Sequence, residues 1–150
     1  MKIDNLRSPY DAVGGMVYFG RMLDKIRLHA QGKLPADMIE NLGTGFDGRC
    51  CGFLRMPYDE IKSKVLADPT LNDVQMLEWC FQTGRRLNQN DLEIWNEFMI
   101  KRGWRDEAHE RLLFRLKEAG LPYDGKIMTM FDYIDYDEGR KSQRHQPDCA

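Results

Sequence analysis

The chain has 150 residues, of which 42% are apolar and 31% are charged, with 22 Lys and Arg residues against 24 Asp and Glu residues. A chain of this length buries enough surface to fold without a structural metal or a disulfide framework. The formal net charge of -2 gives no electrostatic reason to bind a phosphate backbone. We therefore expect no nucleic-acid partner.

The sequence also indicates a cytoplasmic protein without membrane contact. No stretch approaches the roughly 20 continuous apolar residues that a membrane-spanning helix requires. The amino terminus lacks the apolar core of a signal peptide. The cysteines show neither disulfide-framework nor Cys-x-x-Cys spacing, and we expect them to be reduced thiols. They are Cys50, Cys51, Cys80 and Cys149.

The first predicted helix covers residues 9–31, where apolar residues recur at three- and four-residue steps. Ser8 is its expected N-cap. Three larger residues fall on the opposite side of this predicted helix: Tyr18, Arg21 and Lys25. A short helix is expected over residues 35–42. The glycine-rich segment of residues 43–56 has no assigned conformation, although a short helix from Phe46 to Leu54 is an alternative.

The second half of the chain predicts helices separated by glycine and proline. Pro57 begins the first of them, and Asp68-Pro69 ends it. Thr70 and Asp73 form a capping pattern ahead of a helix that continues to residue 83 and is apolar on most of its circumference. The later helices follow in this order: one that Asn90 caps and Gly103 ends, one over residues 105–119, and one over residues 126–136.

These elements predict an all-α fold. We expect a single compact domain of about six helices over residues 1–138, followed by a disordered tail over residues 139–150. The first helix and the helix over residues 71–83 are expected near the centre of the domain.

Several separated sequence runs, in this order, resemble one known family. They are Ser8-Pro9-Tyr10-Asp11, Phe19-Gly20-Arg21-Met22-Leu23-Asp24-Lys25, Glu78-Trp79-Cys80-Phe81, Ile94-Trp95-Asn96, Lys101-Arg102-Gly103-Trp104-Arg105-Asp106 and Phe131-Asp132-Tyr133-Ile134-Asp135. Over roughly residues 4–140 the chain resembles the small bacterial proteins grouped as domain of unknown function 5069 (DUF5069). This resemblance implies a stand-alone, mainly helical cytoplasmic domain. It implies no activity and transfers no catalytic residues.

The run from Gly43 to Gly48 matches the G-x-G-x-x-G pattern of dinucleotide-binding loops. In those loops a strand precedes the glycines, and a helix N-terminus receives the pyrophosphate. Here a predicted short helix precedes the glycines, and no βαβ periodicity follows. We interpret the run as a glycine-rich turn and expect no cofactor.

Cys50 follows Arg49, and this pair is the candidate catalytic site. A guanidinium beside a thiolate lowers the pKa of the thiol and makes it nucleophilic. The favoured interpretation is packing, because unpaired cysteine is among the most buried residue types. No histidine lies nearby in the sequence to act as a base.

Three carboxylates are spaced three residues apart on the last predicted helix: Asp132, Asp135 and Glu138. Hard cations such as Mg²⁺ and Ca²⁺ prefer oxygen ligands, so these residues are a weak metal-site candidate. The favoured interpretation is a solvated polar face without a metal.

A candidate ligand-binding set combines aromatic and cationic residues: Trp79, Trp95, Arg102, Trp104 and Arg105. Such residues can line a pocket for an anionic or planar ligand. Core packing of the tryptophans and helix-end placement of the arginines explain the same pattern.

The sequence therefore favours a binding module without chemistry of its own, because it has no convergent nucleophile, base or metal constellation. Its partner is expected to be a small anionic or planar ligand, or a protein, with a homodimer as one form of the latter. The alternative is a small enzyme that uses Cys50 or the carboxylates of the last helix.

Overall fold

The computed structural model describes residues 1–141, which form two units. The N-terminal unit comprises residues 5–95, and the C-terminal unit comprises residues 1–4 together with the chain from residue 96. The prediction of one domain over residues 1–138 stays a prediction. Residues 142–150, which make up most of the predicted tail, lie outside the described residues.

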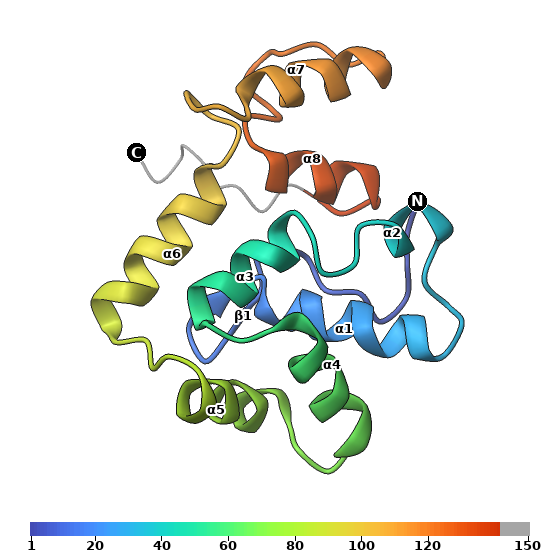
Figure 1. Ribbon diagram of the computed structural model, residues 1–150. Coiled ribbons are helices and arrows are strands. Elements are labelled where there is room, and N and C mark those ends of the chain that lie inside the picture. The colour runs from blue at the N-terminus through green and yellow to red at the C-terminus, as the bar shows by residue number, and fades with distance from the viewer. Residues whose placement is uncertain (142–150) are drawn as a thin grey trace. The chain divides into compact units, whose positions relative to one another are not determined.

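The predicted all-α class is confirmed. The described residues contain eight helices and one two-stranded sheet (Figure 1). The N-terminal unit contains β1 (Ala12–Val13), β2 (Met16–Val17), α1 (Phe19–Ala30), α2 (Ala36–Ile39), α3 (Phe46–Leu54), α4 (Tyr58–Ala67) and α5 (Asp73–Thr83). The C-terminal unit contains α7 (His109–Glu118) and α8 (Met130–Asp137), and α6 (Gln89–Lys101) crosses the boundary. Within residues 1–141, no helix is both long enough and apolar enough to cross a bilayer.

The first half of the predicted helix over residues 9–31 is wrong. Residues 12–17 form an antiparallel hairpin, in which Ala12 pairs with Val17 and Val13 with Met16. Its two turn residues, Gly14 and Gly15, have φ values of 56° and 83°. A two-residue hairpin turn with positive φ at both positions favours glycine strongly, so this dipeptide overrides the helical spacing around it. Ser8 lies in the preceding turn, where its hydroxyl accepts a hydrogen bond from the N–H of Tyr10.

Helix α1 is the centre of the N-terminal unit and packs against α4 and α5 (Figure 1). Fully buried side chains from four helices form this core: Phe19, Met22, Leu23, Ile26, Leu54, Ile61 and Met76. The side opposite the predicted apolar stripe is buried as well, with Tyr18, Arg21 and Lys25 at 2%, 5% and 7% exposure. A central helix in a small core is buried around most of its circumference, and its polar residues therefore require internal partners.

Two of the predicted helix caps are displaced by two residues. Asn72, not Thr70, caps α5, and its side chain exchanges hydrogen bonds with Gln75 in a capping box. Asn88, not Asn90, precedes α6 and exchanges equivalent hydrogen bonds with Asp91. In each case the residue directly before the first turn supplies the cap, because its side chain must reach the N–H three residues later.

The C-terminal unit has its own hydrophobic core, in which α7 and α8 meet. Leu112, Leu116 and Ile127 are buried there. The predicted glycine cap after α7 is confirmed: Gly120 has a φ of 71°, and the N–H of Leu121 donates to the carbonyl of Leu116 over 2.9 Å. The resulting reversal directs the chain back along α7 into the loop that leads to α8.

Candidate functional site

The two predicted ligand-binding residues of the N-terminal unit have internal partners. Trp95 is 3% exposed, its indole N–H donates to the carbonyl of Val17 over 3.0 Å, and its ring stacks on Phe53 at 5.1 Å between centroids. The ring of Trp79 lies 5.5 Å from the Lys64 ammonium. Neither tryptophan lines the cavities described below.

The other three predicted ligand-binding residues lie in the C-terminal unit. The guanidinium of Arg105 stands over the Trp104 ring at 5.3 Å. Arg102 lies over the ring of Phe98 at 5.5 Å and pairs with Asp106 at 3.4 Å. The structure thus brings Trp104 and Arg105 together, and these three residues also lie outside the cavity linings. A ligand site made by all five residues stays a prediction.

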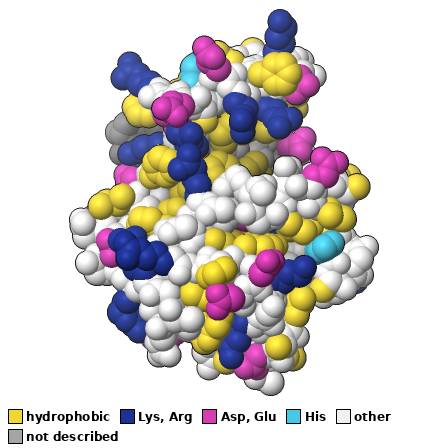
Figure 2. All heavy atoms as spheres, in the orientation of Figure 1, with side chains coloured by type: hydrophobic (Ala, Val, Ile, Leu, Met, Phe, Trp, Pro, Cys, Tyr) yellow, Lys and Arg dark blue, Asp and Glu magenta, His cyan; other side chains and the backbone are white. Residues whose placement is uncertain are grey.

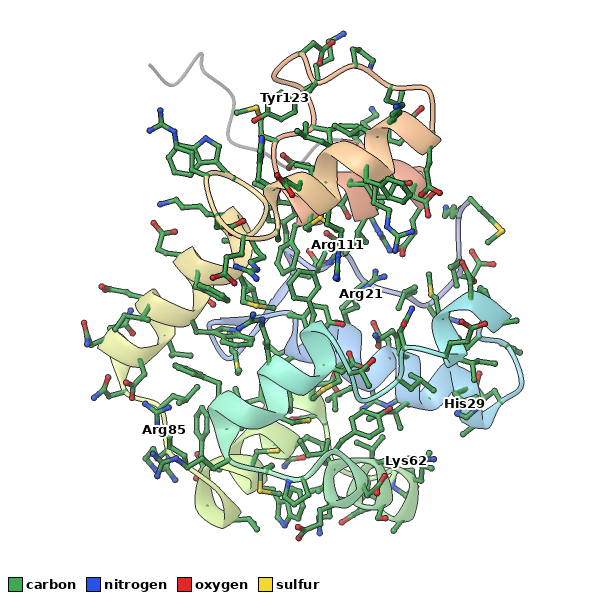
Figure 3. The ribbon with its side chains drawn as sticks, turned by 45° about the horizontal axis from the view of Figure 1, so that its top comes forward. Arg21, His29, Lys62, Arg85, Arg111 and Tyr123 are labelled. Carbon is green, nitrogen blue, oxygen red and sulfur yellow. The ribbon has the colours of Figure 1, made fainter. Side chains whose placement is uncertain are left out.

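Another aromatic and cationic pair, which the sequence analysis did not select, lies at the end of α3. Arg85, labelled in Figure 3, comes from the segment between α5 and α6. Its guanidinium lies 4.7 Å from the centre of the Phe53 ring, and it also pairs with Asp91 at 3.1 Å. Because Phe53 and Arg85 lie far apart in the chain, no local sequence pattern indicates this pair.

The geometry does not favour Cys50 as a nucleophile. Cys50 is fully buried on α3, whereas Arg49 is exposed. Burial raises the pKa of the Cys50 thiol well above its ordinary value, and the nearby Cys51 and Asp47 raise it further. A reactive cysteine requires the opposite environment, in which the thiolate is stabilised and accessible.

We predict that the described thiols react slowly in the folded protein. Burial raises the pKa of both Cys51 and Cys80 to about 12, so at pH 8 they too are protonated as well as hidden. In a Cys149→Ser chain, iodoacetamide labelling of Cys50 at pH 8 should be at least about tenfold slower without urea than in unfolding urea. Mass spectrometry of tryptic peptides measures both rates. Equal rates would contradict the prediction and would favour the alternative of an enzyme that uses the Cys50 thiol.

The glycine-rich loop has an internal anion at its centre. The Asp47 carboxylate accepts hydrogen bonds from the N–H of Gly43 over 3.0 Å and from the Tyr18 hydroxyl over 2.7 Å. It also pairs with the Lys25 ammonium at 2.8 Å, and the Asp47 side chain is fully buried. Asp47 therefore already provides a negative charge where a phosphate would meet a dinucleotide-binding loop. The N–H of Gly43 and the carboxylate of Asp47 thus bind each other within the turn.

The backbone of Tyr18, a member of this buried cluster, is strained. It has a φ of 73°, which a bulky residue rarely adopts. Burial raises the pKa of its hydroxyl well above the ordinary value, and the neighbouring Asp47 adds to this effect. The sequence analysis missed the cluster, although Tyr18 and Lys25 are seven residues apart, which places them on one side of the chain entering α1.

A second ionic network joins the start of the N-terminal unit to α1 and α5. Asp73 in α5 accepts hydrogen bonds from Arg7 and Arg27, and Arg7 also binds Asp24 in α1. Burial alone raises the pKa of Asp73, but the hydrogen bonds from Arg27 and Arg7 outweigh it, and the net pKa is lowered. The network holds the N-terminal segment against two helices.

Asp73→Asn is expected to lower the free energy of unfolding by about 1–2 kcal/mol at pH 7. Since the pKa of Asp73 is lower in the folded chain, its contribution is present above the unfolded pKa and is lost as the pH falls through the folded pKa. The difference from wild type should therefore shrink below about pH 4. Urea denaturation at pH 7 and pH 3 measures it. Asp59→Asn, an exposed acid in the first turn of α4, is the control for helix-dipole effects.

The carboxylates of α8 do not form the expected solvated face. Asp132, Asp135 and Glu138 are 6%, 1% and 4% exposed. Arg140 pairs with both Asp135 and Glu138, and a carboxylate oxygen of Asp132 accepts the N–H of Met128 over 2.9 Å. These partners explain the burial, because a buried carboxylate must be paired or hydrogen-bonded. Within residues 1–141, no group of three or more His, Cys, Asp or Glu side chains is arranged to hold a metal ion.

A cavity of about 360 Å³ lies against α8, and we call it the α8 pocket. Its apolar wall is formed by Leu121, Pro122 and Ile127. Its polar lining contains charges of both signs and one phenol: Asp124, Lys126, Asp132, Arg140 and Tyr136. Only Asp132 of these residues was selected from the sequence. The four-residue spacing of Asp132 and Tyr136 is the signal that places these two residues on one side of α8. Arg140 lies beyond the end of the helix, so this spacing does not place it.

A further cavity of about 380 Å³ lies in the N-terminal unit, at the ends of α1 and α4 and the start of α5. Its lining is mainly apolar but also includes the charged residues Arg27 and Asp68. The guanidinium of Arg27 is bound to Asp73 at 2.6 Å. On the face shown in Figure 2, basic and acidic side chains are scattered among hydrophobic ones.

The described residues form a small helical protein with a cavity of small-molecule size in each unit. A family model described as domain of unknown function (DUF5069) matches residues 3–140. This match covers nearly the whole chain, and the chain therefore belongs to the DUF5069 family. It confirms the resemblance carried by the separated sequence runs. No curated protein matches the chain.

Proposed function

We propose that this protein is a binding module that holds a small molecule in the α8 pocket and performs no chemistry on it. The observation that carries the proposal is the lining of the pocket, where an apolar wall faces side chains of both charges. Ligand sites typically combine apolar surface with a few placed polar groups in a cavity of roughly 300–1,000 Å³. The α8 pocket has this composition and this size.

The alternative of a small enzyme has less support. Cys50 is buried and protonated, and the carboxylates of α8 are engaged by Arg140 and by backbone N–H groups. The proposal includes a cytoplasmic location, which the free thiols of Cys50, Cys51 and Cys80 support. A protein partner or a homodimer is the other predicted mode of binding, and the exposure of Phe114 and Leu113 on α7 supports it.

A thermal-shift screen against amino acids, organic acids, amines and nucleotides tests the proposal. A compound at 100 times its dissociation constant adds about 2.7 kcal/mol to stability, which raises the Tm by several degrees. Tyr136→Ala removes a half-exposed wall residue of the pocket and should abolish the shift.

Tyr123→Ala is the matched control. Tyr123 is a similarly exposed tyrosine of the same unit, packed edge-on against His109 and outside the pocket lining (Figure 3). This variant should retain the shift. A flat screen, or a shift that Tyr136→Ala leaves unchanged, would contradict the proposal.

A further inference from the structure

We infer that one exposed side of α7 is a contact surface for a second copy of this chain, which lies on it in antiparallel orientation. Four residues at positions i, i+3, i+4 and i+7 of the helix form this side, and we call it the α7 face: Glu110, Leu113, Phe114 and Lys117. The inference assigns an interface to the homodimer and is independent of the α8 pocket.

Two large apolar side chains of the α7 face are open to solvent. Leu113 is 37% exposed, and Phe114 is 59% exposed. The other apolar residues of the helix are occupied, because Leu112 and Leu116 are buried in the core that α7 shares with α8. The helix thus buries one stripe in its own unit and leaves a second apolar surface for a partner.

The two charges of the α7 face have no partner in their own chain. Within residues 1–141, the Glu110 carboxylate and the Lys117 ammonium make no hydrogen bond or ion pair, and both side chains are exposed. They lie two turns apart, about 10 Å along the helix axis, with the apolar pair between them. Each charge is therefore available to an opposite charge on another molecule.

The order of the four residues makes the α7 face complementary to itself. The midpoint between Glu110 and Lys117 along the axis falls between Leu113 and Phe114. If a two-fold axis passes through this midpoint, two antiparallel copies of α7 place Glu110 of each copy opposite Lys117 of the other. The apolar residues of both copies then meet between the two ion pairs.

The same charges exclude the parallel arrangement and favour a second copy over other partners. In a parallel pair Glu110 would face Glu110 and Lys117 would face Lys117, and like charges across an interface cost affinity. A different partner would have to supply a base and an acid at the same two-turn spacing around an apolar surface. A second copy supplies that spacing by symmetry.

The contact is small, so we expect a weak dimer. Helix α7 has 10 residues and is about 15 Å long, which places an interface centred on it at the low end of the range for protein–protein contacts. The expected dissociation constant is on the order of 100 µM. Monomer and dimer should therefore coexist, in proportions that depend on concentration.

Sedimentation equilibrium of the full chain from about 10 µM to about 1 mM should show the wild type shifting from monomer to dimer. Glu110→Lys and Lys117→Glu each place like charges at both ends of the contact, and each should weaken the dimer at least about tenfold. Glu60→Lys is the matched control and should leave association unchanged. Glu60 is an exposed acid in the first turn of α4, as Glu110 is in the first turn of α7.

Mixing the two single variants tests the antiparallel register. Glu110→Lys and Lys117→Glu should each associate poorly alone, but one copy of each restores both ion pairs with their signs exchanged. A 1:1 mixture should therefore dimerise within about threefold of the wild-type affinity. A variant that had merely misfolded could not produce this recovery.

Phe114→Ala tests the apolar part of the contact. It should weaken the dimer at least about tenfold, because it removes the larger apolar side chain at the centre of the interface. Val74→Ala, at a position on α5 that is 58% exposed, should leave association unchanged.

A wild-type chain that stays monomeric at about 1 mM would overturn the inference and leave the α7 face to a different protein. It would also be overturned by charge variants that dimerise as the wild type does, or by a mixture that fails to recover. None of these outcomes bears on the α8 pocket, which the thermal-shift screen tests separately.

Discussion

Replacing Asp47 by asparagine is expected to lower the free energy of unfolding by about 3–5 kcal/mol. The Asp47 carboxylate is fully buried and compensates the Lys25 ammonium, which is itself 7% exposed. Asparagine keeps the shape of the side chain but removes its charge, so a buried ammonium is left without its counter-ion. Urea denaturation followed by circular dichroism measures the loss.

A double-mutant cycle separates this ion pair from general disturbance of the loop. If the pair is responsible, Asp47→Asn combined with Lys25→Met should lose about 1–3 kcal/mol less than the sum of the two single losses. Asp37→Asn, an exposed acid in the first turn of α2, should change stability by less than about 0.5 kcal/mol. Additive losses in the cycle would show that the pair itself contributes little.

Gly84→Ala is expected to destabilise the chain by about 3 kcal/mol for a steric reason. A Cβ atom at Gly84 would overlap the carbonyl oxygen of Leu54 and lie 2.8 Å from the Cγ atom of Met56. The Leu54 oxygen cannot move aside freely, because it accepts the N–H of Arg85 over 2.8 Å. Urea denaturation measures the loss of stability. We attribute this loss to disruption of the hydrogen bond between the Arg85 N–H and the Leu54 carbonyl, which joins the ends of α3 and α5.

Gly52→Ala is the matched control for the change from glycine to alanine. Gly52 lies inside α3, and a Cβ atom there would meet nothing within 4 Å. Alanine is favoured over glycine in a helix by about 1 kcal/mol, so this variant should be as stable as wild type or more stable. Similar losses from both variants would contradict the steric explanation.

Local signals in the sequence were sufficient for much of the fold. The start of α4 after Pro57 and the glycine reversal at Gly120 were predicted, since each depends on residues close together in the chain. The helix from Phe46 to Leu54 had been only an alternative for a segment without an assigned conformation. The hairpin before α1 was missed because Ala12 and Met16 also fit a helical stripe. Gly14-Gly15, a typical hairpin turn, was the signal that should have decided between them.

The candidate site depended on contacts that sequence spacing does not encode. Asp132, Asp135 and Glu138 were recognised as one row of carboxylates, but the burial of Asp135 and Glu138 depends on Arg140, which had been assigned to the tail. The loop that supplies Lys126 and the apolar wall reaches α8 only because Gly120 reverses the chain. Whether a row of charged side chains faces water or the interior is decided by partners of this kind, and the spacing of the charged residues in the sequence does not reveal it.

The three buried cysteines of the N-terminal unit are natural probes of how cooperatively this unit opens, so no probe residue has to be introduced. Cys50 and Cys51 come from α3, and Cys80 comes from α5. A hidden thiol reacts only from opened conformations, so its alkylation rate follows the population of those conformations, as amide hydrogen exchange does. Equal protection at all three thiols would mean that α3 and α5 open in one step. Weaker protection at Cys80 alone would identify α5 as a separately opening segment.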